Sequence, residues 1–300
     1  MKVSTLYPSQ CWLGESPLWH ETRKSCLWVD IENGILYELD RATKKLQTWD
    51  IKSRVSTIIE HHDGDLILGV QGGIVKFNFD DDSIDWLADI EKETPENRCN
   101  DGACDSSGRI WMGVMDIRAK KKAGSLYCIH HDFALEKMIA GITIPNGIVW
   151  SLDNERMYFI DTIQGNVNSY LFNSQTNEIE FEKVAIHFPD GTGLPDGMCI
   201  DEEGMLWVAL YGGGCVTRCN PLTGELMESI QLPALHVTNC CFVGDNLEHL
   251  VITTAREHLT EQQLLNYPQS GDVFIAENVG VKGVPVNKAV HVTLKASNKF

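Results

Sequence analysis

The chain has 300 residues, of which 43% are hydrophobic and 22% charged, and a formal net charge of −17 at pH 7. This acidic balance argues against nucleic-acid binding, which requires a cationic surface, and against docking on anionic membrane lipid. The length and composition are those of a globular protein with a sizeable core. Because there is no linker and no shift in composition, we expect a single domain spanning residues 1–300.

The N-terminus and the cysteines indicate a cytoplasmic protein. Residues 1–8 contain no apolar core of a signal peptide, and no segment approaches the roughly 20 apolar residues needed to cross a bilayer. The ten cysteines form no recognisable framework, so reduced thiols are expected. Cys215 and Cys219 have the spacing of zinc ligands, but no second pair completes a site, and both are expected to be ordinary strand residues.

Short apolar runs rich in Val, Ile and aromatic residues, separated by Gly, Asp and Asn, predict β-strands along almost the whole chain. After a first strand at residues 2–7, the strands group into units of four, beginning with 16–19, 26–30, 34–40 and 45–50 and continuing with 55–60, 66–70, 73–78 and 84–89. Three further units run from residues 100 to 140, 146 to 187 and 196 to 232. A sixth, with strands at 237–243, 249–254 and 271–277, is one strand short. Residues 258–266 predict a short helical segment with Thr260 as its N-cap.

A repeat of roughly 40–50 residues with four strands per unit is the sequence signature of a β-propeller. Six units fit the length of the chain. The N-terminal strand can supply the strand missing from the sixth unit, which would pair the chain ends and remove an exposed sheet edge. The predicted fold is therefore all-β: a six-bladed β-propeller with four-stranded blades, closed by the N-terminal strand.

Four units begin with a similar short sequence motif, here called a phrase. In each copy a polar residue stands next to turn-forming residues and is followed by an apolar strand. The polar residues at this position are Glu15, Asn100, Asn146 and Asp196. Because the blades of a propeller are related by rotation about one axis, residues at one phase of the repeat should converge on the central channel. Two carboxylates and two amides, with no lysine among them, predict a site for a hard divalent cation.

Turn formation is the competing interpretation of this pattern. Asn-Gly and Asp-Gly are common turn dipeptides because Gly and Asn tolerate positive φ. Taken singly, Asn100, Asn146 or Asp196 is therefore better explained as a turn residue. Their shared phase, together with Glu15, which turn propensity does not explain, favours the metal site.

The sixth unit and the histidines carry weaker signals. Either Thr238 or Asn239 is expected to line the channel, because the predicted strand register allows both. His236 precedes that strand and could approach the channel. The other histidines expected at turns or on the rim are His61, His62, His130 and His131. There is no Gly-x-Ser-x-Gly elbow, which disfavours catalysis by a nucleophilic serine.

The most specific phrases of the chain are Gly14-Glu15-Ser16-Pro17-Leu18-Trp19, Arg98-Cys99-Asn100-Asp101-Gly102, Pro145-Asn146-Gly147 and Pro195-Asp196-Gly197. With these phrases, in this order along nearly its whole length, the chain resembles the gluconolactonase, regucalcin (senescence marker protein) and luciferin-regenerating enzyme family of six-bladed propellers.

The resemblance implies a set of site residues and an activity. Glu15, Asn146 and Asp196 would be the protein ligands of one divalent metal ion. Arg98 and Asn100 would contact the substrate, and Asp196 would also serve as the catalytic acid/base group. The implied activity is hydrolysis of a sugar lactone, an aldonolactone such as glucono-, xylono- or arabinolactone, to the aldonic acid.

One segment departs from the family pattern. After Gly113-Val114-Met115-Asp116, where regucalcin carries acidic residues, this chain has the basic run Ile117-Arg118-Ala119-Lys120-Lys121-Lys122. It is either a solvated basic loop or a lid whose Arg118 meets the hydroxyls or a negative group of the substrate. Sugar preference can therefore not be transferred from the animal proteins.

Other functions and several properties stay open at this point. The alternatives to a lactonase are a non-enzymatic calcium-binding or regulatory propeller that uses the same cage, and an interaction propeller, against which the convergent acids count. The metal ion could be Ca²⁺, Zn²⁺, Mn²⁺ or Fe²⁺, because an oxygen-rich site admits several. The expected partner is a small-molecule sugar lactone, and the protein is expected to be a monomer or a weak homo-oligomer.

Overall fold

The computed structural model describes residues 1–291, and β-strands account for most of this range. Helix is as scarce as predicted: the helical segments within the range are η1 (Thr162–Gln164) and α1 (Glu261–Asn266). Thr260 is the N-cap of α1, where its side chain accepts a hydrogen bond from the Gln263 backbone in a capping box. No helix of the described residues is long and apolar enough to span a membrane.

Four sheets contain four strands each, joined antiparallel in chain order. The first two comprise β2 (Gly14–His20), β3 (Ser25–Asp30), β4 (Ile35–Asp40) and β5 (Leu46–Asp50), and β6 (Val55–Glu60), β7 (Leu66–Val70), β8 (Gly73–Phe77) and β9 (Ile84–Asp89). The next two comprise β10 (Asn97–Cys104), β11 (Ile110–Asp116), β12 (Gly124–Ile129) and β13 (Leu135–Ile142), and β14 (Pro145–Trp150), β15 (Arg156–Asp161), β16 (Asn166–Phe172) and β17 (Ile179–His187).

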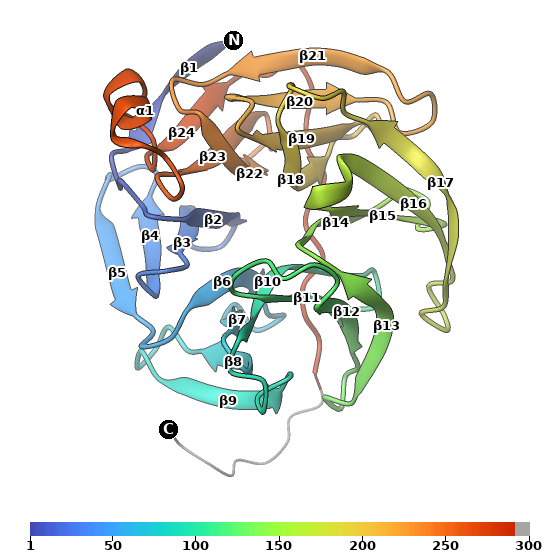
Figure 1. Ribbon diagram of the computed structural model, residues 1–300. Coiled ribbons are helices and arrows are strands. Elements are labelled where there is room, and N and C mark those ends of the chain that lie inside the picture. Colours follow the sequence, from blue (N-terminus) through green and yellow to red (C-terminus); the bar gives the residue numbers. More distant parts are fainter. Residues whose placement is uncertain (292–300) are drawn as a thin grey trace.

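The remaining strands form one eight-stranded sheet. It joins β18 (Leu194–Ile200), β19 (Leu206–Tyr211), β20 (Cys215–Cys219) and β21 (Leu226–Gln231) to β22 (His236–Val243), β23 (His249–Ala255), β24 (Val273–Glu277) and β1 (Lys2–Tyr7). The connection between the two groups is a single residue pair, Tyr211 with His236. In Figure 1 the sheets stand around a common centre with the first strand of each group innermost, which is consistent with a propeller.

The two ends of this strand series meet as predicted. β1 pairs antiparallel with β24, from Lys2 opposite Glu277 to Tyr7 opposite Val273. The N-terminal strand thus completes a row of four strands and covers the outer edge of β24, which would otherwise present unpaired backbone groups.

Each inner strand carries an irregularity near its start. Register shifts against the second strand fall at the same place in all six, between Glu15 and Leu18, Val55 and Thr57, Cys99 and Gly102, Asn146 and Ile148, Pro195 and Met198, and Val237 and Asn239. A β-bulge of this kind redirects the side chains of the bulged strand. The bulges therefore set the direction of the polar residues that share the repeat phase.

The interpretation of Asn-Gly and Asp-Gly as turns is wrong. Asn146-Gly147 and Asp196-Gly197 lie inside β14 and β18, and neither glycine has a positive φ. A Cβ atom on Gly197 would lie 2.0 Å from the Asn239 side chain, and one on Gly147 would lie 2.8 Å from the Asp196 carbonyl oxygen. These positions require glycine because the neighbouring inner strands approach too closely for a side chain.

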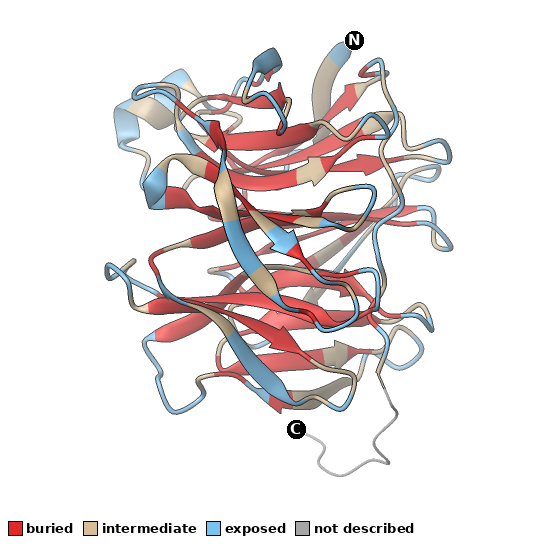
Figure 2. Ribbon diagram, turned by 90° about the vertical axis from the view of Figure 1, so that its right-hand side faces the viewer, coloured by how far each residue is buried: buried red, intermediate tan, exposed pale blue. Residues whose placement is uncertain are grey.

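The core lies between adjacent sheets. Trp28, Trp111 and Trp207, on β3, β11 and β19, are completely buried. Figure 2 shows buried residues along the inner and middle strands, whereas much of the outermost strands is exposed. The ring therefore provides a rigid frame around the channel.

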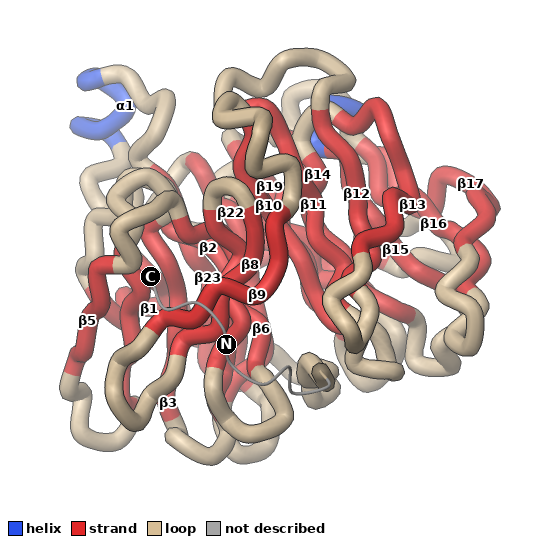
Figure 3. The backbone as a smooth tube through the Cα atoms, turned by 90° about the horizontal axis from the view of Figure 1, so that it is seen from below, coloured by secondary structure: helices blue, strands red, loops and turns tan. Residues whose placement is uncertain are grey.

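Residues 279–291, here called the C-terminal strap, cross one face of the ring. The backbone of the strap bonds to the first turn of several sheets: Gly283 N donates to Leu247 O, Glu202 N to Lys282 O, Ala289 N to Glu60 O, and Val290 N to Gly108 O. The side chain of Lys288 reaches Glu60 at 2.7 Å. We call this side the strap face; η1 and α1 lie on the opposite side of the ring, where both blue segments appear in Figure 3.

Candidate metal and substrate site

The three predicted metal ligands lie at the bulges of three inner strands. Glu15 is on β2, Asn146 on β14 and Asp196 on β18, and all are buried, with exposed fractions of 7%, 4% and 7%. Asn100 bonds to Asn146 at 3.0 Å and the charge of Glu15 acts on Asp196, so residues of the shared repeat phase from different sheets lie near one another.

Glu15 is held from two sides. One carboxylate oxygen, Oε2, accepts hydrogen bonds from the Ser16 backbone N–H at 2.8 Å and from Asn239 Nδ2 at 3.0 Å. Of the two candidates in the sixth unit, Asn239 is therefore the one in the channel. Thr238 instead donates its hydroxyl to Gly14 O.

Asn100 connects the predicted substrate contacts to the predicted ligands. Its Nδ2 donates to Pro145 O at 2.7 Å and to Asn146 Oδ1 at 3.0 Å, and its Oδ1 accepts from Arg98 Nη1 at 2.5 Å. Asn146 in turn donates through Nδ2 to Thr162 Oγ1 at 2.7 Å. These contacts fix the Asn146 amide with its oxygen toward Asn100, and that oxygen keeps a second lone pair for another partner.

The electrostatics of the channel are those of uncompensated buried acids. Burial raises the pKa of Glu15 to about 8, and the negative charge of Asp101 adds to this effect. Burial also raises the pKa of Asp196 well above its ordinary value, again with contributions from Glu15 and Asp101. The guanidinium of Arg98 opposes both shifts, but burial lowers the pKa of Arg98 itself. A cation between these carboxylates would remove their mutual repulsion.

Asp101 is a channel acid that sequence reasoning missed. It follows Asn100 in the bulge of β10, where its Oδ1 accepts from Gly102 N at 2.8 Å, and burial raises its pKa to about 6. In the other three copies of the phrase the following residue is Ser16, Gly147 or Gly197. The sequence feature that could have revealed Asp101 is a carboxylate directly after the repeated polar residue, since a bulge can turn two successive side chains inward.

The donor set fits a hard divalent cation. Glu15 and Asp196 offer carboxylate oxygens and Asn146 an amide oxygen, which are ligands that Ca²⁺ and similar ions prefer. Within residues 1–291 there is no group of three or more His, Cys, Asp and Glu side chains in metal-holding geometry. The predicted set contains only two such residues, so its fit rests on the uncompensated carboxylates and the oriented amide.

Arg118 is not brought together with the other predicted residues. It lies in the exposed loop between β11 and β12, whose Arg118 and Lys120 backbone N–H groups bond to Asp116 Oδ1. No hydrogen bond or ion pair links the Arg118 side chain to a channel residue in the described part of the chain. This geometry agrees with the solvated-loop interpretation.

Among the described residues, His236 contacts Tyr211 and Glu257 and bonds to no predicted site residue. Its ring stacks on Tyr211 with centroids 3.9 Å apart, and its Nδ1 lies 2.9 Å from Glu257 O. The Tyr211 hydroxyl donates to the same carbonyl at 3.1 Å, and its pKa is raised by burial and by the charges of Glu257 and Asp196. His61 and His62, by contrast, lie on the strap face beside Ala289.

A family model described as the SMP-30/Gluconolactonase/LRE-like region matches residues 13–256. The chain belongs to this family. Within it, regucalcin from Pongo abelii is 34% identical over 289 residues, which cover 95% of this chain and 97% of the relative. Two solved structures are also similar.

The solved structures extend the likeness to the whole ring. A luciferin-regenerating enzyme matches with a TM-score of 0.91 and 28% identity, covering 96% of this chain and 99% of its own. Regucalcin from Agrobacterium tumefaciens, a calcium-binding protein, matches with a TM-score of 0.89 and 28% identity, covering 97% of both chains. Membership of the SMP-30/gluconolactonase/LRE-like family, expected from four short phrases, is confirmed.

Proposed function

We propose that the protein is a metal-dependent sugar lactonase that hydrolyses an aldonolactone to the aldonic acid. The observation that carries the proposal is a pair of buried carboxylates, Glu15 and Asp196, that face one channel beside the amide of Asn146. Within residues 1–291 neither carboxylate is bonded to an arginine or lysine. We further propose that the ring is a six-bladed propeller, in which the eight-stranded sheet counts as two blades joined at Tyr211 and His236.

Glu15, Asn146 and Asp196 would hold the metal ion. When bound there, a divalent cation supplies a Lewis acid that polarises the lactone carbonyl and stabilises negative charge on its oxygen. Ca²⁺ is the first ion to test, because a relative of the same architecture is a calcium-binding protein. Zn²⁺, Mn²⁺ and Fe²⁺ are the other candidates.

Asp196 would move the proton. It takes a proton from water as the water oxygen bonds to the carbonyl carbon, and it returns that proton to the ring oxygen as the carbon–oxygen bond of the lactone breaks. The products are a carboxylic acid and a free hydroxyl on the same sugar chain. Because a carboxylate bound to a metal ion is a weak base, the Lewis acid would supply most of the acceleration.

Arg98 and Asn100 would orient the substrate. Arg98 is 7% exposed, and its guanidinium is already directed by the bonds to Cys99 O and Asn100 Oδ1. A pre-oriented donor of this kind holds the ring hydroxyls or the carbonyl oxygen in the reactive position. Arg118 would act only if its loop closes over the channel.

The test is an assay of acid release from five- and six-membered aldonolactones, performed on metal-stripped protein to which each candidate ion is returned. We expect no turnover without metal, turnover with at least one ion, and loss of both turnover and metal affinity in Asp196→Asn. Hydrolysis by Asp196→Asn at the wild-type rate would overturn the assignment.

A non-enzymatic calcium-binding role is the second candidate, since the same oxygen cage would serve it and the Agrobacterium tumefaciens relative binds calcium. This role is supported if Glu15→Gln and Asp196→Asn alter Ca²⁺ affinity while the wild type turns over no aldonolactone. In either role we propose a cytoplasmic protein, because all ten cysteines are free thiols, and a monomer or weak homo-oligomer with a small molecule as its main partner.

A further inference from the structure

The channel continues past the site toward the strap face as a cavity of about 370 Å³. Its walls come from all six inner strands, at the residues that follow the site residues along each strand. After Glu15 these are Ser16 to Leu18, after Asn146 they begin at Ile148, and after Asp196 they begin at Met198. Strap residues 284–287 form part of the wall at the far end. We call this cavity the lower chamber.

The lower chamber is apolar with an acidic spot. Its side chains are mainly aliphatic or aromatic, among them Leu18, Ile58, Ile148, Met198, Phe242 and Val284. No lysine or arginine of the described residues lines it, and its carboxylates are those of Glu60 and Asp101.

The two carboxylates differ in their partners. Glu60 is paired with Lys288 at 2.7 Å. Asp101 has no ion pair among residues 1–291 and accepts from its neighbouring Gly102 N–H at 2.8 Å. Asp101 is half-buried, and a carboxylate that is partly removed from water and has no counter-charge favours the arrival of a cation.

We propose that the lower chamber is a second ligand site that takes a small, largely apolar organic cation, a primary ammonium compound, with its ammonium group on Asp101. The volume lies within the range of small-molecule pockets, which are typically apolar with a few placed polar groups. An anion is disfavoured because Glu15 and Asp196 add negative charge on the same channel. The apolar walls suit a hydrocarbon body rather than a sugar.

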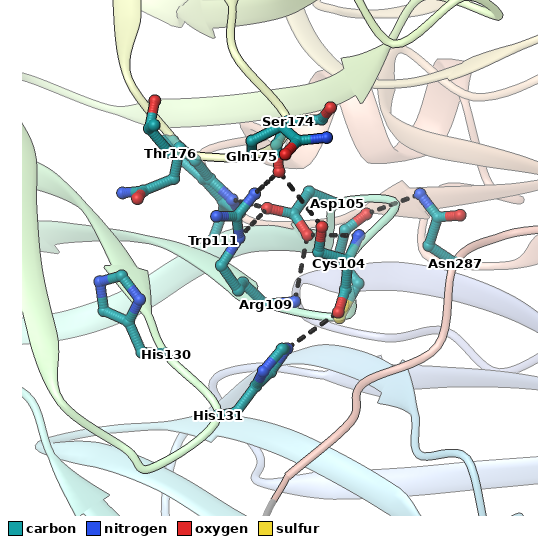
Figure 4. A network of polar contacts seen from close by, with 12 residues as sticks. Cys104, Asp105, Arg109, Trp111, His130, His131, Ser174, Gln175, Thr176 and Asn287 are labelled. Atoms are coloured by element: carbon teal, nitrogen blue, oxygen red, sulfur yellow. Dashed lines mark hydrogen bonds and ion pairs between the residues drawn. The ribbon is translucent and has the colours of Figure 1, made fainter.

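The ligand enters from the strap face. Leu152 and Val286, both in the chamber wall, are 48% and 52% exposed and therefore lie at an opening to solvent. The strap next to this opening is tied down by Asn287, whose Nδ2 donates to Cys104 O at 3.1 Å, as Figure 4 shows. Entry on this side leaves the opposite end of the channel free for metal and lactone.

Occupancy of the chamber should be coupled to the metal site. Asn239, which lines the chamber together with Asp101, donates to Glu15 Oε2 at 3.0 Å, so the chamber adjoins a proposed metal ligand. An ammonium ion on Asp101 lowers the negative potential that attracts a divalent cation above it, and by linkage the cation weakens amine binding by the same factor. This coupling, though not the chamber site itself, rests on the proposed metal site.

The test uses 2-phenylethylamine, with 2-phenylethanol and 3-phenylpropionate as neutral and anionic controls of similar shape. Binding to the full-length, metal-stripped protein is measured by calorimetry and by ligand-observed NMR, without any lactone. We expect the amine to bind at least tenfold more tightly than the alcohol and the carboxylate not to bind. Saturating amine should weaken Ca²⁺ binding several-fold without abolishing it.

Two variants locate the site. Asp101→Asn should remove the preference for amine over alcohol, and Val284→Phe, which fills the chamber from the strap, should weaken all binding while Ca²⁺ affinity is kept. The control Asp153→Asn, an exposed acid in the turn next to Leu152, should change nothing. Thermal melting of each variant reports whether it has folded.

Several results would overturn the proposal. They are equal affinity for amine and alcohol, amine binding that Val284→Phe leaves unchanged, and full mutual exclusion of amine and Ca²⁺, which would place the ammonium among the metal ligands. A second Ca²⁺ site that disappears in Asp101→Asn would identify the occupant as an inorganic ion instead. None of these outcomes bears on whether lactones are hydrolysed.

Discussion

Two groups of carboxylates in this protein have opposite surroundings. Asp105 and Asp201 lie in the strap-face turns that follow β10 and β18, each six residues before a buried tryptophan, and both are completely buried. Glu15, Asp101 and Asp196 lie in the channel. Each carboxylate of the first group is paired with an arginine, whereas those of the second group have no ion pair within residues 1–291.

Asp105 is satisfied from every side. Its oxygens accept from Arg109 Nε at 2.6 Å, Trp111 Nε1 at 3.0 Å and the Ser107 backbone at 2.9 Å, as drawn in part in Figure 4. Through Arg109, whose Nη2 donates to Ser174 O at 2.7 Å, the network reaches the next sheet. The carboxylate therefore fastens a turn and two sheets together.

Asp201 repeats this arrangement two units later. It accepts from Arg218 Nε at 2.8 Å, Trp207 Nε1 at 2.9 Å and the backbone of Glu203 and Met205 at 3.0 Å. Glu15 and Asp196 are nearly as buried and Asp101 is half-buried, but none of the three bonds to an arginine within residues 1–291. Because the same fold gives Asp105 and Asp201 an arginine partner and gives Glu15 and Asp196 none among the described residues, the contrast supports the cation site proposed above.

Removal of a channel carboxylate should abolish chemistry and spare the fold. In Asp196→Asn we expect hydrolysis by the metal-loaded protein to fall by about 10²–10⁴-fold, the range for loss of an acid/base group. The melting temperature of the metal-free variant should equal or exceed that of the wild type, because a buried charge has been removed. Parallel acid-release and thermal-melting measurements check both parts, and a large loss of stability would contradict the comparison.

Removal of a carboxylate that is paired with an arginine should instead reduce the stability of the fold. In Asp201→Asn the free energy of unfolding should fall by about 3–5 kcal/mol, because Arg218 and Trp207 lose a buried partner. Urea titration of the metal-free protein measures this. Glu203→Gln is the matched control: Glu203 pairs with the same Arg218 at 2.7 Å but is 61% exposed, so its loss should cost only about 0–1 kcal/mol. Equal costs for the two variants would show that burial of Asp201 is not the cause.

The pH dependence of stability should reveal the raised pKa of a channel carboxylate, Asp101. The pKa of Asp101 is raised from 3.8 to about 6. As pH rises through this interval, the unfolded chain loses its proton first, so the folded metal-free protein loses stability, and the loss is complete above pH 6. Asp101→Asn should therefore gain about 1–3 kcal/mol over the wild type above this interval and nothing at its acid end. Denaturant titrations at several pH values measure the difference, and a gain that is independent of pH would contradict the assignment.

Much of the ring follows from the sequence because its signals are local. Alternating apolar runs and turn residues located the strands, and the short sixth unit led to the pairing of β1 with β24. The repeat phase also located Glu15, Asn146 and Asp196. These inferences depend on patterns within single units, which the sequence displays directly.

The features that the sequence did not predict depend on contacts between units. The bulge between Val237 and Asn239 decides which side chain faces the channel, and a register shift of one residue has no sequence signature. Gly197 is required by the Asn239 side chain of the next inner strand, not by its own φ. The strap could not be foreseen either, because it has no periodic pattern and is held by the turns of other sheets.

Substitution of Arg118 should have the smallest effect on activity. It tests the hypothesis from the sequence that the basic loop is a lid over the site. As part of an exposed loop without side-chain contacts to the channel, Arg118→Ala should leave kcat/KM within about twofold and the unfolding free energy within about 0.5 kcal/mol of the wild type. The matched comparison is Arg98→Ala, since Arg98 is buried beside Asn100 and should lose at least tenfold in kcat/KM. A rise in KM for Arg118→Ala that approaches the effect at Arg98 would instead establish the loop as a lid, because only closure could bring an exposed guanidinium to the substrate.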